Sequence, residues 1–159
     1  MRRLRTFACA ISVAFGGLVV VSDAQAQSPF GGPLFAVLNG GNECVAPGPT
    51  CRKGDLDGIG SATITFPTAN SVCWGINVDS IGGATAAHIH RGTSGVNGVV
   101  VVSLSAPNAP GAGNPGASSG CVGGIAAGII AAIRNDPTRF YVNVHNARFP
   151  DGAVRGQLH

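Results

Sequence analysis

The sequence predicts an all-β protein, an antiparallel β-sandwich with Greek-key-like connections and one short helix. Short runs rich in β-branched residues alternate between apolar and polar side chains, as half-buried strands do. Glycine, proline, asparagine and aspartate separate these runs, which is typical of turns between strands. Beyond the N-terminal segment, a single stretch repeats its apolar residues at helical spacing.

The first 26 residues are predicted to be a signal peptide. Three arginines precede an apolar stretch at 7–21 that is too short to span a bilayer comfortably, and Ala24-Gln25-Ala26 fits a cleavage site. We therefore expect a secreted or periplasmic protein with one domain at 27–159 and no membrane span in the mature chain. That domain has seven basic and six acidic residues and no basic stripe with aromatics, which argues against a nucleic-acid partner.

The strands are predicted in chain order from their alternation. Ala62, Ile64 and Phe66, for example, alternate with polar side chains. The run of four valines at 99–102 does not alternate, so we expect both faces of its strand to be covered. The predicted strands are 34–38, 61–66, 72–78, 85–90, 99–104, 140–145 and 153–158.

One helix and two long loops complete the prediction. Four isoleucines between residues 124 and 134 recur at near-helical spacing, and Pro137 lies just beyond them, where a helix must end. Residues 44–60 and 106–120 are rich in glycine, proline and small polar side chains, which predicts loops.

The cysteines agree with export to an oxidising compartment, because four of them remain after Cys9 leaves with the signal. Four cysteines allow three pairings, and sequence alone does not choose among them. We favour Cys44–Cys51, which brackets a proline-glycine turn, and Cys73–Cys121, which ties a strand to the end of a long loop.

Four linked motifs follow one another along the chain: L-N-G-G-N-E at 38–43, G-S-A-T at 60–63, A-H-I-H-R-G at 87–92 and F-P-D-G-A-V-R-G-Q-L at 149–158. Together they resemble the CHRD domain, the repeat named after chordin, over roughly residues 34–158. The resemblance implies an extracellular or periplasmic β-sandwich. It does not imply inhibition of a growth factor, because the cysteine-rich binding domains that accompany the module in chordin are missing here.

Three histidines are the candidate metal ligands. His88 and His90 project from the same face of one predicted strand, and His145 lies near the end of another. If the strands are neighbours, three imidazoles converge, and imidazole suits copper or zinc. The alternative is that the histidines bond to neighbouring backbone and brace the loop after Arg91.

Glu43 and Arg155 form a predicted structural ion pair. Glu43 is the one glutamate of the chain, and Arg155 interrupts an otherwise uncharged run. A guanidinium near a core needs a carboxylate or carbonyl partner, because an unpaired buried charge is costly.

The sequence shows no catalytic motif, and we assign no catalytic or organic-cofactor residues. The predicted function is an exported, non-enzymatic binding or structural module whose partner is an unknown protein or extracellular ligand. The alternative is a mononuclear copper- or zinc-binding protein that uses the three histidines, with redox activity if the ion is copper.

Overall fold

The computed structural model describes residues 31–43, 53–108 and 116–159, and these form eight strands and one α-helix. The predicted signal peptide and the predicted Cys44–Cys51 bridge lie outside the described residues. None of the helices in the described ranges is long and apolar enough to cross a membrane. The strands are β1 (Leu34–Asn39), β2 (Ile59–Thr68), β3 (Ser71–Asp79), β4 (Ala84–Arg91), β5 (Val99–Leu104), β6 (Gly116–Val122), β7 (Phe140–Asn146) and β8 (Val154–Gln157).

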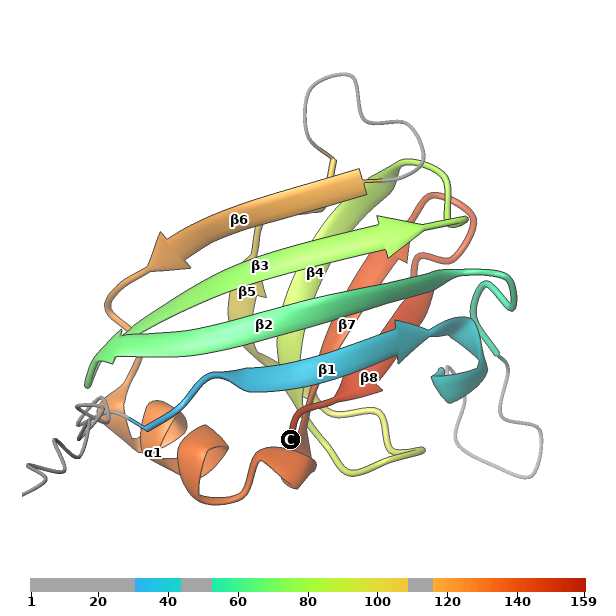
Figure 1. The fold of residues 1–159 in the computed structure, drawn as a ribbon. Coiled ribbons are helices and arrows are strands. Elements are labelled where there is room, and N and C mark those ends of the chain that lie inside the picture. Colours follow the sequence, from blue (N-terminus) through green and yellow to red (C-terminus); the bar gives the residue numbers. More distant parts are fainter. Residues whose placement is uncertain (1–30, 44–52, 109–115) are drawn as a thin grey trace, which may run out of the picture.

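The strands form one antiparallel sheet in the order β5-β4-β7-β8-β1-β2-β3-β6. This sheet folds over into two layers (Figure 1): β1, β2, β3 and β6 cross in front of β4, β5, β7 and β8. The layers join where β8 meets β1, through the residue pair Asn39 and Arg155. The all-β antiparallel prediction is confirmed, with the addition that the two layers belong to one nearly closed sheet.

The core lies between the layers and follows from the alternation of each strand. β2 and β3 bury every second side chain, including Ile64 and Ile76. In the other layer β4 buries Ala87 and Ile89, and β7 buries Val142 and Val144. Because strand side chains alternate, the residues between these apolar positions must face outward from the sandwich.

The predicted helix is present as α1 (Ala127–Asn135), at one end of the two layers in Figure 1. Ile130 and Ile133 are buried in the core, whereas Asn135 at the end of the helix is exposed. After Asp136 the chain turns into a short 3-10 helix (Pro137–Arg139) that leads directly into β7. The helix therefore closes the open end of the core and delivers the chain to the central strand of its layer.

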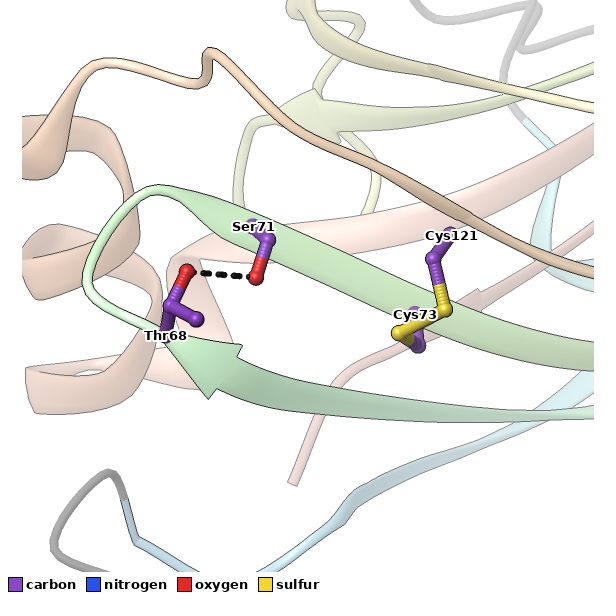
Figure 2. The surroundings of a disulfide bond; sticks show 4 residues. All are labelled: Thr68, Ser71, Cys73 and Cys121. Carbon is purple, nitrogen blue, oxygen red and sulfur yellow. Dashed lines mark hydrogen bonds between the residues drawn. A yellow bond between two sulfur atoms is a disulfide. The ribbon is translucent and has the colours of Figure 1, made fainter.

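The predicted Cys73–Cys121 disulfide is confirmed, with an S–S distance of 2.06 Å. Figure 2 shows this bond between neighbouring strands, near the Thr68–Ser71 turn, whose hydroxyl oxygens lie 2.6 Å apart. Cys73 on β3 and Cys121 on β6 are direct register partners. The bond therefore attaches the edge strand β6 to β3, its neighbour in the sheet that the described residues form.

Part of the loop predicted at 106–120 is wrong, because residues 116–122 form β6. Its glycine, alanine and serine residues have low strand propensity. Pairing with the edge of β3 nevertheless satisfies the backbone N–H and C=O groups of β6 that face β3. Gly120 also fits closely against Trp74, since an added Cβ would lie 2.8 Å from the indole ring.

The prediction that both faces of the valine strand are covered is also wrong. β5 is the edge strand at the other end of the sheet, and Val99 and Val100 are 71% and 47% exposed. Val102 and Leu104 are buried in the core and Val101 packs against it, but the part of the chain that the structure describes does not cover Val99 and Val100.

Candidate metal centre

The candidate site occupies the outer face of β4 and β7. Because Ala87 and Ile89 point into the core, His88 and His90 point outward, and Asn143 and His145 do the same on β7. The register pairs His88 with Asn143, His90 with Tyr141, and Ala86 with His145. The pairing of β4 with β7 thus gathers the predicted ligands on one patch of sheet.

The three predicted histidines converge. One ring nitrogen from each of His88, His90 and His145 lies within 4.8 Å of the others. His88 Nδ1 and His145 Nε2 are 3.1 Å apart, and the ring centroids of His88 and His90 are 5.5 Å apart. His90 is only 8% exposed, and the other two are partly buried. The centre is therefore a shallow cluster with a buried inner end.

The hydrogen bonds determine which nitrogen of each ring carries a lone pair. His145 Nδ1 lies 3.0 Å from the Pro150 carbonyl oxygen, and His90 Nδ1 lies 2.9 Å from the Gly98 carbonyl oxygen. A carbonyl only accepts, so both Nδ1 atoms donate, and in neutral rings both Nε2 atoms are bare acceptors. His88 Nδ1–H then donates to His145 Nε2.

His90 Nε2 is the unusual atom of the cluster. It is fully buried and has no hydrogen-bond partner among the described residues. Buried polar side-chain atoms in proteins nearly always have a partner, since leaving one unpaired costs free energy. The lone pair of His90 Nε2 is therefore without a proton donor among the described residues.

The three imidazoles are neutral at physiological pH. Burial lowers the pKa of His88 to about 4, and the electrostatic repulsion that a protonated His88 would meet from His145 and His90 adds to this effect. Burial also lowers the pKa of His90, although the bond to Gly98 opposes it, and burial lowers that of His145 in spite of its bond to Pro150. Neutral imidazole is the form that binds metal ions.

Tyr141 holds His90 in place. The two rings stack with centroids 4.9 Å apart and planes only 6° from parallel. From the neighbouring strand β8, the guanidinium carbon of Arg155 lies 3.6 Å from the Tyr141 centroid. The Tyr141 hydroxyl oxygen accepts the Gly98 backbone N–H at 3.1 Å, so it is already engaged in holding the loop.

The loop from Gly92 to Gly98 covers this part of the face and is bonded to it throughout. Arg155 donates to the carbonyls of Thr93 and Val96, each at 3.2 Å, and to Asn97 Oδ1 at 3.3 Å. Gln157 Nε2 donates to the Gly92 carbonyl at 2.7 Å. His90 also bonds to this loop through the Gly98 carbonyl, as the bracing alternative predicts, and Arg155, Gln157 and Tyr141 hold the loop together with it.

The predicted partners Glu43 and Arg155 are both buried, at 0% and 1% exposed. Burial lowers the pKa of Arg155, whereas Tyr141 and the negative charge of Glu43 raise it. The Glu43 carboxylate packs against Gly152, where an added Cβ would lie 2.5 Å from Oε1. The hydrogen bonds described above join the Arg155 guanidinium to the loop at 92–98. A direct ion pair between Glu43 and Arg155 stays a prediction.

Sequence reasoning assigned no role to Asn143. This residue is 3% exposed, and its Oδ1 is fully buried without a hydrogen-bond partner among the described residues. Its position in the sequence could have indicated a role. Asn143 is two residues from both Tyr141 and His145, so the alternation of the strand places its amide on the same face as these two side chains.

Comparison with known proteins agrees with the motifs of the sequence. The CHRD domain matches residues 34–158, which include all eight strands and every residue of the histidine cluster. Searches among curated proteins and among solved structures found no match. The match covers most of the chain, and the protein therefore belongs to the CHRD domain family.

Proposed function

We propose that this protein is an exported, non-enzymatic CHRD module that binds one copper or zinc ion through His88, His90 and His145. The observation that carries the proposal is the convergence of three imidazoles, one of which, His90, has a buried Nε2 with no hydrogen-bond partner in the described part of the chain. Copper and zinc are the ions that an all-imidazole donor set suits best.

The surroundings of the histidines support this assignment. A histidine that binds a metal usually donates its other ring N–H to a backbone carbonyl or carboxylate, which fixes the ring and its tautomer. His90 and His145 make such bonds to Gly98 and Pro150. Metal–nitrogen bonds of about 2.0–2.1 Å require the rings to close by about an ångström from their present spacing.

Export is the second part of the proposal. The Cys73–Cys121 bond is consistent with an oxidising compartment, and the N-terminal 26 residues read as a signal peptide. We therefore place the mature protein in the periplasm or outside the cell. Its partner there would be an extracellular protein or ligand.

A second candidate is a CHRD module in which the histidines serve structure alone. The bond between His88 and His145 favours it, because it consumes the lone pair of His145 without a metal. This alternative leaves the buried His90 Nε2 unexplained.

Metal analysis of the purified mature protein separates the two candidates. We expect about one equivalent of copper or zinc by mass spectrometry, lost on chelation and regained on titration with Cu(II) or Zn(II). His90→Ala and His145→Ala should each weaken binding at least tenfold. His159→Ala, which removes the exposed C-terminal imidazole, is the matched control and should bind as the wild type does. Wild-type protein that takes up neither ion, or a folded triple histidine variant that binds as tightly, would refute the metal proposal.

A further inference from the structure

Asn143 lies on the same outer face as the histidine cluster, next to His88 and His145. It is the register partner of His88 on β4 and is two residues from His145 on the same face of β7. Directly opposed residues in an antiparallel pair have Cβ atoms about 4.5–5.5 Å apart, and residues two apart on a strand are separated by about 7 Å. The short amide therefore forms the floor of the patch on which the longer imidazoles converge.

The oxygen of this amide lacks the partner that a buried acceptor normally has. Asn143 Oδ1 has no hydrogen bond within the described residues, although the side chain is almost wholly covered. Its neighbour Tyr141 makes no hydrogen bond to it: the Tyr141 hydroxyl oxygen accepts the Gly98 N–H, and the ring is stacked on His90. Two acceptors without donors, Asn143 Oδ1 and His90 Nε2, thus lie on the same small patch. A bound cation would satisfy both, as would a water molecule that donates two hydrogen bonds, and the metal titrations below distinguish the two.

We propose that Asn143 Oδ1 is the fourth ligand of this centre, which makes it a three-nitrogen, one-oxygen site. This inference rests on the proposed metal binding by the three histidines and adds a specificity-determining residue to it. An amide oxygen is a hard donor, whereas Cu(I) prefers soft ligands. Asn143 therefore favours Cu(II) and Zn(II) over Cu(I), relative to a site built from the three imidazoles alone.

The test compares Asn143→Leu with the wild type, using Cu(II), Zn(II) and Cu(I) as the probes. We expect the leucine variant to bind Cu(II) and Zn(II) at least tenfold more weakly in chelator competition, with little change for Cu(I). A tenfold loss for Cu(II) alone raises the one-electron potential by about 59 mV. The Cu(II) electron paramagnetic resonance spectrum should also change. Asn77→Leu, the same substitution at an exposed position on β3, is the matched control and should change none of these.

The apo protein provides a check on folding. Leucine removes an unpaired buried acceptor, so Asn143→Leu should not lower the melting temperature of the metal-free protein. If this variant fails to fold, Asn143→Asp tests whether residue 143 is a ligand. A carboxylate ligand at this position should tighten Cu(II) and Zn(II) binding at least tenfold.

The outcomes separate the inference from the function on which it rests. Unchanged Cu(II) affinity and spectrum in Asn143→Leu, with binding still lost in the histidine variants, would overturn the role of Asn143 and leave the metal site intact. Aspartate that fails to tighten binding counts against the role in the same way. Wild-type protein that binds no metal would remove both proposals.

Discussion

Arg155 is the buried charge on which the polar face of the molecule depends. Its side chain is 1% exposed, and its guanidinium donates to two loop carbonyls and to Asn97 while lying over the ring of Tyr141. Substitution with alanine removes all of these contacts together. It also leaves the Val96 carbonyl without its Arg155 donor unless water enters beneath the loop, whereas the Thr93 carbonyl keeps the backbone N–H of Val96.

The loss in free energy of unfolding can be estimated from these contacts. A hydrogen bond from a charged group contributes about 1.5–3 kcal/mol, and a desolvated cation–π contact about 2 kcal/mol. The loop lies at the surface and can rehydrate, so the full sum is not lost. We expect Arg155→Ala to lower the free energy of unfolding by about 3–5 kcal/mol. Arg155→Lys keeps the charge without the planar fork and should cost less, about 1–3 kcal/mol.

Urea unfolding followed by tryptophan fluorescence and circular dichroism measures the loss, and hydrogen exchange reports on the loop. We expect exchange to rise at 93–98 in both variants, with little change in β2 and β3. A double-mutant cycle with Glu43→Gln tests the predicted ion pair, which requires a coupling energy above about 0.5 kcal/mol. A loss below 1 kcal/mol in Arg155→Ala, with the loop still protected, would show that this account of the buried guanidinium is wrong.

Three further predictions concern stability. Cys73→Ser should lower the free energy of unfolding by about 4 kcal/mol, because the bridge spans a sequence separation of 48; an equal loss when wild type and variant are compared under reducing conditions would contradict this. Gly152→Ala should lower the free energy of unfolding by about 2–3 kcal/mol, because the φ of Gly152 is 144° and the new Cβ would lie 2.5 Å from Glu43 Oε1. Gly82→Ala, at a φ of 67° with open space around it, is the control and should lower it by about 1 kcal/mol in the same urea assay. The pKa of His88 is lowered to about 4, below the 6.5 of the unfolded chain, so its contribution to the stability of the metal-free protein is present above pH 6.5 and is lost as the pH falls towards 4. Urea midpoints at pH 7.5 and 5 should therefore differ more in the wild type than in His88→Gln.

The fold could be predicted wherever a strand has one buried and one open face. The alternation in β2 and β3 identified both strands and their inward residues, and the isoleucine spacing identified α1. β6 could not be predicted in the same way, because its residues are small and its strand conformation depends on pairing with β3. The valines of β5 show the converse case, since a continuous apolar run was read as burial on both faces and instead belongs to an edge strand.

The candidate site could be predicted only in part, for a related reason. Alternation placed His88 and His90 on one face, but His145 joins them only because β4 pairs with β7 rather than with another strand. The register between strands so distant in sequence is decided by the closure of the whole sheet, which no local pattern reports. The burial of Asn143 and the engagement of Tyr141 by the loop depend on that same register.

The arrangement of the outer face explains why so many polar groups are buried in one place. An antiparallel layer normally leaves its outer face in water, but here the segments at 92–98 and 150–152 fold back over β4, β7 and β8. Each polar side chain under them then needs a partner. Arg155, Gln157 and Tyr141 find theirs in the loop backbone, which holds the cover in place. Among the described residues His90 Nε2 and Asn143 Oδ1 retain unpaired acceptors, and the proposed cation would bind to both.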